Sequence, residues 1–248
     1  MSEEISGPFD VTHEGFLSGL RHDTFSGEGE MIMNAKWVLG LAALILSGGM
    51  HAVASAQEVP PPGVSATLFE NIKPTLLKPF PESVALGRVK ITFEETKLDT
   101  VRTAIGIGEI SHKGDASHTI HWLCYTLKTS DGSQRVWLSS SEMGGGEYID
   151  DVDVRTLSPA EAVSPTCPAL EGTKYPLVID GGLGVGMTTR DMIKTLGEPS
   201  ASQGEWAAYA YNGKATLHGE SYDVTSRLHV HLRDGRIDGI SAFKTTSN

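Results

Sequence analysis

Polar residues near the C-terminus alternate in a way that places three ligand-binding groups on one side of an expected strand. In "RLHVHLR", residues 227–233, His229, His231 and Arg233 alternate with apolar residues. A period of two is typical of a strand with one buried and one accessible face. Because aromatic and guanidinium groups often anchor protein partners, we interpret these three as candidate binding residues.

A second group of histidines, His112, His118 and His121, lies in "SHKGDASHTIHW". Three imidazoles are enough ligands for an open Zn²⁺ site. Their spacing matches no familiar motif, and surface or hydrogen-bonded histidines are the alternative. We therefore predict neither a metal nor another cofactor, and keep a metal- or small-ligand-binding protein as the second hypothesis.

Sequence signatures of catalysis are absent. The glycine-rich "GGLGVGM" (181–187) lacks both the glycine order and the lysine of phosphate-binding loops. No Gly-x-Ser-x-Gly element occurs. We expect a protein that is not an enzyme, with a hydrolase as the third hypothesis because Ser, His and Asp are abundant.

The elements that must position these residues occur twice. "TKLDTVRTAIG" (96–106) and "TTRDMIKTLG" (188–197) each begin with Thr, carry Asp three residues later and end in Gly. Each is typical of a short helix, with Thr96 or Thr188 as its N-cap. "WLCYTL" (122–127) matches "WAAYAY" (206–211), and "RVWLSSS" (135–141) matches "RLHVHLR". Matching blocks in one order indicate an internal duplication.

This duplication predicts an α+β fold of two tandem repeats, each a short helical segment packed on a small antiparallel sheet. The repeats span 84–155 and 177–248, and a linker covers 156–176. Trp122, Trp137 and Trp206 fall out of phase with the expected core positions, so we expect them on accessible faces as further binding residues. The opposite phase, with the tryptophans in the core, is the alternative.

The second repeat resembles the small outer-membrane lipoproteins of the BamE/SmpA type. The resemblance rests on Gly-Met-Thr at 186–188, Leu-Gly-x-Pro at 196–199, Trp206, Tyr209 and Asp-Gly at 234–235. The tandem arrangement is similar to that of the β-lactamase inhibitory proteins. The resemblance implies an exported, non-enzymatic module that binds another envelope or extracellular protein, in envelope assembly or as an inhibitor. No lipid-attachment Cys is present, and no residue matches an inhibitor's contact loop.

The N-terminal part predicts export to the periplasm or beyond the cell. Residues 33–56 have the marks of a signal peptide, namely Lys36, an apolar run from Trp37 to Leu46, and Ala54-Ser55-Ala56 as the cleavage site. A buried core helix is the alternative interpretation of this segment. Cleavage after Ala56 leaves a chain for which we expect no transmembrane span. We expect residues 1–32 to be an untranslated or non-native leader and 57–83 to be a proline-rich arm.

Charge and cysteine content restrict the partners and the compartment. The chain has a net charge of −11, and without residues 1–56 it keeps 18 basic and 24 acidic residues. This balance argues against a nucleic-acid partner. Cys124 and Cys167 are the two cysteines, and an even count in an exported protein predicts one disulfide that pins the linker to the first repeat. Two buried free thiols are the alternative.

Overall fold

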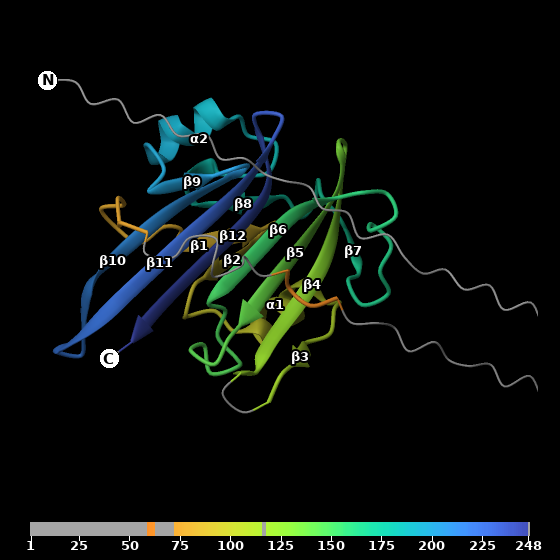
Figure 1. Ribbon diagram of the computed structural model, residues 1–248. Helices are drawn as coiled ribbons and strands as arrows, with labels where there is room; N and C mark the ends of the chain where they lie inside the picture. Colours follow the sequence, from red (N-terminus) through yellow and green to blue (C-terminus); the bar gives the residue numbers. More distant parts are fainter. Residues whose placement is uncertain (1–58, 63–71, 116–117, 248) are drawn as a thin grey trace, which may run out of the picture. The chain divides into compact units, whose positions relative to one another are not determined.

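The described part of the chain is mostly β-structure. The computed structural model describes residues 59–62, 72–115 and 118–247 (Figure 1). Strands make up 49% and helices 11% of this region. The predicted leader and signal peptide lie outside the described residues, as do 57–58 and 63–71 of the predicted arm.

One nine-stranded sheet dominates the described region. Its strands, in spatial order, are β3 (Ser111–Lys113), β4 (Ile120–Thr129), β5 (Gly132–Ser140), β6 (Asp151–Leu157), β12 (Arg236–Ser247), β11 (Glu220–Arg233), β10 (Trp206–Leu217) and β9 (Ala201–Gln203). Neighbours along this path are antiparallel, and β7 (Ala169–Glu171) pairs with β4 in parallel.

The prediction of a two-repeat α+β fold is wrong. The matched blocks lie on β4 and β10 and on β5 and β11, but these strands belong to one sheet rather than to two small ones. The sheet is continuous because β6 pairs with β12 from Asp151↔Phe243 to Arg155↔Gly239. Unpaired strand edges attract other strands, and a repeat pattern does not reveal that two edges of one chain satisfy each other.

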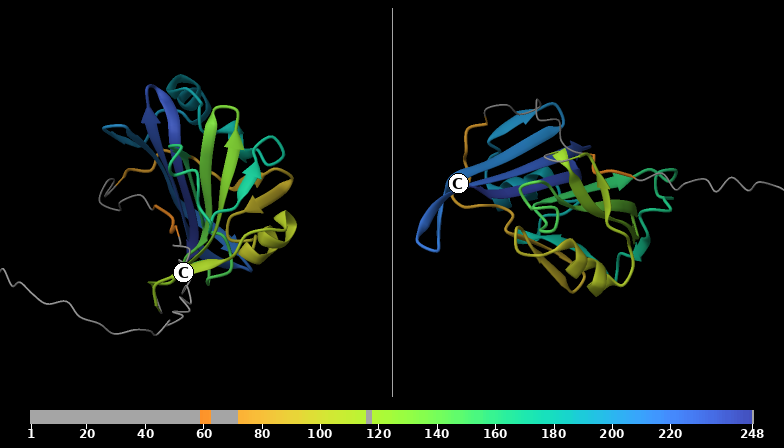
Figure 2. Two further views of the ribbon diagram at one scale, coloured as in Figure 1. Left: turned by 90° about the vertical axis from the view of Figure 1, so that its right-hand side faces the viewer. Right: turned by 90° about the horizontal axis from the view of Figure 1, so that it is seen from below.

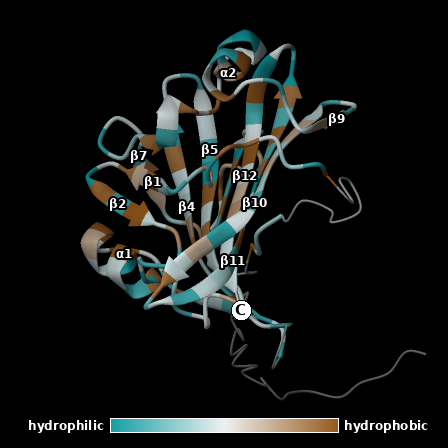
Figure 3. Cartoon of the chain, turned by 90° about the vertical axis from the view of Figure 1, so that its left-hand side faces the viewer, coloured by the Kyte–Doolittle hydropathy of each residue, from teal (hydrophilic) through white to brown (hydrophobic). Residues whose placement is uncertain are grey.

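The main core lies on one face of this sheet, which we call the core face. A small sheet of β2 (Val89–Thr92), β1 (Ser83–Leu86) and β8 (Leu177–Ile179) lies with α1 (Leu98–Ile105) beside β4 (Figures 2 and 3). Helix α2 (Thr189–Leu196) follows a short 3-10 turn, η3 (Asp180–Gly182). Leu123, Leu228 and Val230 are fully buried in one cluster with residues of both helices and of the small sheet. Leu228 and Val230 therefore face the core, as the alternation predicted.

The predicted cap of α2 is confirmed, whereas that of α1 is wrong. The Thr188 hydroxyl accepts a hydrogen bond from the Asp191 N–H at 3.2 Å, and Gly197 ends the helix with φ +82°. In α1 the N-cap position belongs to Lys97, without a side-chain cap. Thr96 instead accepts from the N–H of Thr92 at 2.9 Å. Its hydroxyl is thus used by the turn that ends β2.

The described end of the predicted arm contacts the folded body. The N–H groups of Thr75 and Leu76 both lie 3.1 Å from the carbonyl oxygen of Ala210 on β10, beyond the end of β9. The Ser226 hydroxyl also bonds both backbone groups of Phe80. Thr75 and Leu76 thereby occupy a backbone carbonyl that β9 leaves unpaired at the sheet edge.

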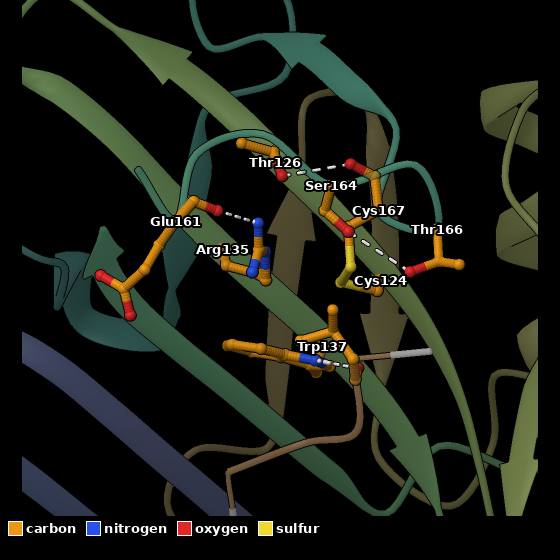
Figure 4. The surroundings of a disulfide bond; sticks show 9 residues. Cys124, Thr126, Arg135, Trp137, Glu161, Ser164, Thr166 and Cys167 are labelled. Atoms are coloured by element: carbon orange, nitrogen blue, oxygen red, sulfur yellow. Dashed lines mark hydrogen bonds between the residues drawn. A yellow bond between two sulfur atoms is a disulfide. The ribbon is translucent and has the colours of Figure 1, made fainter. Parts of the chain in front are cut away.

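Cys124 on β4 and Cys167 in the linker form the predicted disulfide, with Cα atoms 4.7 Å apart and a sequence separation of 43 (Figure 4). The bridge is accompanied by a hydrogen bond from the Thr126 hydroxyl to the Cys167 carbonyl at 3.1 Å. It fixes the linker on the side of β4 away from the helices.

Removing this disulfide should destabilise the protein by roughly 4 kcal/mol, because a loop of this length loses its constraint on the unfolded chain. Cys124→Ala and Cys167→Ala should each lower the melting temperature, and the double variant should match the singles. Thiol alkylation of the denatured, unreduced protein should label neither residue. Full labelling of both would contradict the bridge.

Two substitutions of Thr188 provide a matched test of helix capping. Thr188→Ala should cost about 1 kcal/mol in chemical denaturation, the usual effect of deleting an N-cap hydroxyl. Thr188→Ser, which keeps the acceptor, should recover most of the loss. If Thr188→Ser is as destabilised as Thr188→Ala, the cap does not contribute.

Candidate binding site on the polar face of the large sheet

The face of the large sheet opposite the core carries ordered rows of polar and aromatic side chains, and we call it the polar face. Strand register defines three rows that run from β4 across β5, β6, β12 and β11 to β10. The first row is Thr126, Arg135, Arg155, Gly239, His231 and Trp206. The second is Cys124, Trp137, Asp153, Ser241, His229 and Ala208. The third is Trp122, Ser139, Asp151, Phe243, Arg227 and Ala210.

The half of the polar face on β4 and β5 is covered. Trp122 is 2% exposed and Trp137 is 0% exposed, and both pack with the disulfide, Val59 and Ile120 in a second apolar cluster. The two tryptophans face away from the helices, as predicted, but they are not accessible to a partner in this conformation. No pattern in the sequence indicates that the linker and Val59 cover them.

Cationic side chains flank the buried indole of Trp137. The guanidinium groups of Arg135 and Arg155 lie 5.9 Å and 5.4 Å from its ring centre, and Figure 4 shows Arg135 between Trp137 and the linker. Arg135 donates to the carbonyl of Glu161, and Arg155 lies 3.4 Å from the Glu161 carboxylate. Burial lowers the pKa of Arg135, and the charge of Arg155 adds to this. Contacts of this kind hold the indole in one orientation.

The other half of the polar face contains a pocket of about 470 Å³. Its walls come from β6, β10, β11 and β12, from the start of the linker and from Pro62. Gly239 leaves space between Arg155 and His231, since a Cβ at this position would lie 3.3 Å from the His231 Cβ. Of the predicted binding residues, Trp206, His231 and Arg233 all line this pocket, which brings three of the six together.

His231 is held by contacts on every side. Its Nδ1 bonds the carboxylate of Asp238, and its Nε2 lies 3.5 Å from a Glu205 carboxylate oxygen. The Trp206 ring lies edge-on at 4.7 Å between centroids. Arg233 contacts the other Asp238 oxygen at 3.2 Å and stays 63% exposed. The site thus presents a fixed imidazole and indole beside an accessible guanidinium.

His229 lies one row away and is half-buried. Desolvation lowers its pKa, and the nearby charge of Arg227 lowers it further. Both effects favour the neutral form of the ring. His229 faces the polar side as predicted, without lining the pocket described above.

Two carboxyl groups of β6 form a buried pair that the sequence interpretation missed. Burial raises the pKa of Asp153 to about 6, against the effect of hydrogen bonds from Ser241 and Asp151. Burial and the neighbouring Asp153 raise the pKa of Asp151 well above its ordinary value. The Asp151 Oδ1 atom is buried without a partner. Such a pair is stable when one carboxyl keeps its proton and donates to the other.

His112, His118 and His121 do not come together in a group that could hold a metal ion. His112 and His121 are opposite each other on β3 and β4 with ring centres 5.7 Å apart, and His118 precedes β4. The Nδ1 atom of His121 lies 2.8 Å from the Gly146 carbonyl oxygen. In the ranges that the structure describes, no group of three or more His, Cys, Asp or Glu residues could hold a metal ion. Nor does any helix there have the length and apolarity to cross a membrane.

The pattern "DVDVRTL", residues 151–157, is the part of the sequence that could have indicated this carboxyl pair. Its apolar residues Val152 and Val154 are buried in the core, and Asp151, Asp153 and Arg155 fall on the opposite face. The alternation predicts a strand, but only the pairing with β12 places these residues beside Ser241 and His231.

Comparisons with models of known protein families, with curated proteins and with solved structures give no match. The resemblance to the BamE/SmpA type and to the β-lactamase inhibitory proteins therefore remains a prediction, and the site must be interpreted from its own geometry.

The buried carboxyl pair predicts that stability falls with rising pH. Because the folded pKa of Asp153 and Asp151 is raised, the folded state binds more protons than the unfolded state above about pH 4. The stability that the pair contributes is therefore fully present below that pH and is lost as pH rises through the folded pKa of about 6. Asp151→Asn should remove much of the loss and raise the melting temperature at pH 8, by about 2–4 °C for each kcal/mol.

Thermal melts at pH 5 and pH 8 test this against Asp131→Asn, at the exposed turn between β4 and β5. The control should keep the wild-type difference between the two pH values. An equal difference in Asp151→Asn would rule out the pair as its source.

Proposed function

We propose that the protein is an exported, non-enzymatic binding module that recognises another envelope or extracellular protein through the open half of the polar face. The observation that carries the proposal is the set of Trp206, His231 and Arg233 around one pocket. Indole and guanidinium groups at the centre of a depression are the usual anchors of protein interfaces. The disulfide supports an oxidising compartment.

The contacts of His231 favour binding over catalysis. A general base needs a ring nitrogen that can accept a proton from a nucleophile. Both nitrogens of His231 instead face carboxylates, from Asp238 and Glu205. The same contacts fix the ring orientation, which lowers the entropy that a partner must remove on binding.

The pocket dimensions favour recognition of a short protruding part of the partner. About 470 Å³ is at the lower end of the range for drug-sized ligand pockets. The walls carry both signs of charge, Arg155 and Arg233 against Asp238 and Glu161. A partner segment with a polar or aromatic side chain can fill this space while its backbone lies across the sheet.

Site-specific photocrosslinking tests the proposal in intact cells that express the protein with its own N-terminal sequence. A crosslinker at Arg233 should give a discrete adduct with one envelope protein, while a crosslinker at Arg102 on α1 should not. In the variant that carries the crosslinker at position 233, Trp206→Ala should reduce the adduct at least fivefold, because an aromatic hot spot contributes about 2 kcal/mol or more to the free energy of binding. Equal adducts at both positions, or no effect of Trp206→Ala in folded protein, would reject the proposal.

A further inference from the structure

A short proline-rich segment of the chain lies on the covered half of the polar face. The segment is Val59–Pro62, with the sequence Val-Pro-Pro-Pro. The Trp137 Nε1–H donates to the Val59 carbonyl at 3.0 Å, and Val59 packs on the cluster of tryptophans around the disulfide. Pro62 reaches the neighbouring pocket and lines it. The segment therefore connects the buried indole with the open half of the face.

The sequence of this segment restricts how it can be recognised. Each proline fixes φ near −65° and has no backbone N–H. Consecutive prolines favour the extended polyproline II helix, whose carbonyls remain free to accept hydrogen bonds. Val59 precedes a proline and is itself biased toward the extended region. The segment thus presents acceptors and apolar surface, and its ordering costs little entropy.

The surface beneath is complementary to these properties. An indole N–H is a donor without acceptor capacity, so it suits a backbone carbonyl. Arg135 and Arg155 fix the ring of Trp137, while the disulfide and Trp122 supply apolar contact. Aromatic grooves that bind proline-rich segments combine these features.

We propose that the apolar surface around Trp137, on which Val59 packs, is a recognition site for a proline-rich, extended segment of a partner protein, and that Val59–Pro62 is an internal copy of this ligand. The proposal rests on the function proposed above and names the chemistry of the partner. A partner segment replaces Val59 on the Trp137 N–H and continues past the position of Pro62 into the pocket of His231 and Trp206.

The internal copy sets the conditions for partner binding. A segment that belongs to the same chain competes with a free ligand at a high effective concentration. The internal copy therefore excludes peptides of low affinity from the site in the wild type. A partner that also binds in the pocket gains contacts that the internal copy lacks. Weakening the internal copy should uncover the site for a short peptide.

The test uses the full chain and a fluorescent hexapeptide, Glu-Val-Pro-Pro-Pro-Gly, in anisotropy titrations. A variant with Pro60→Gly, Pro61→Gly and Pro62→Gly loses the pre-formed extended conformation of the internal copy. It should bind the peptide at least tenfold more tightly than the wild type. Replacing the three peptide prolines by alanine should abolish binding.

A conservative substitution of Trp137 tests the contribution of its indole N–H separately from that of the aromatic ring. Trp137→Phe in the triple-glycine background keeps an aromatic ring but removes the N–H, and it should weaken peptide binding at least fivefold with an unchanged circular dichroism spectrum. Trp206→Phe in the same background is the matched control, and it should leave the affinity for this hexapeptide within twofold. In the wild type, the Trp137 indole proton should exchange with solvent more slowly than in the triple-glycine variant.

Three results would overturn the proposal. They are no peptide binding by the folded triple-glycine variant, equal indole exchange in both proteins, and failure of that variant to fold. The last result would make Val59–Pro62 part of the fold rather than an exchangeable ligand. Any of them, together with an intact Arg233 adduct, would reject the proline-rich ligand and leave the binding module in place.

Discussion

The pairing of β6 with β12 is the constraint on which the rest of the structure depends. It joins Val154 to Ile240 and Asp153 to Ser241, so that strands far apart in the chain share one sheet. On the core face this pairing lets residues from both halves enter a single apolar cluster. On the polar face it aligns Arg155 with His231 across Gly239 and creates the pocket between them. Without this ladder, the pocket-lining groups of β6 and β11 would lie on separate sheets.

A sheet of this size has two faces to cover, and the chain covers them by different means. The core face is covered by α1, α2 and the small sheet through apolar packing. The first half of the polar face is covered by the disulfide-linked loop and by Val59, and polar groups are buried in the process. Buried carboxyls and unpaired hydroxyls such as that of Ser139 lower stability, and proteins often retain such features where function requires them.

Local features could be predicted from the sequence because their causes are local. The cap of Thr188, the phase of Leu228 and Val230, and the disulfide all follow from residue type and spacing over a few positions or from the cysteine count. The fold class could not be predicted, since β6 and β12 pair through residues that are 84 or more positions apart. Trp137 shows the same limit at the site. Its direction followed from alternation, but its burial depends on Val59, which is remote in sequence.

The two coverings of the Trp137 region differ in strength, and this difference links architecture to function. The loop that contains Cys167 is held by a covalent bond, so it stays in place while the protein is oxidised. Val59 is held by an indole hydrogen bond and apolar contact, which together are worth only a few kcal/mol. The accessible area of the polar face is therefore set by the weaker covering. A ligand that competes with Val59 would join the buried indole to the pocket of Trp206 and His231, and so extend one binding surface across β5, β6, β12 and β11.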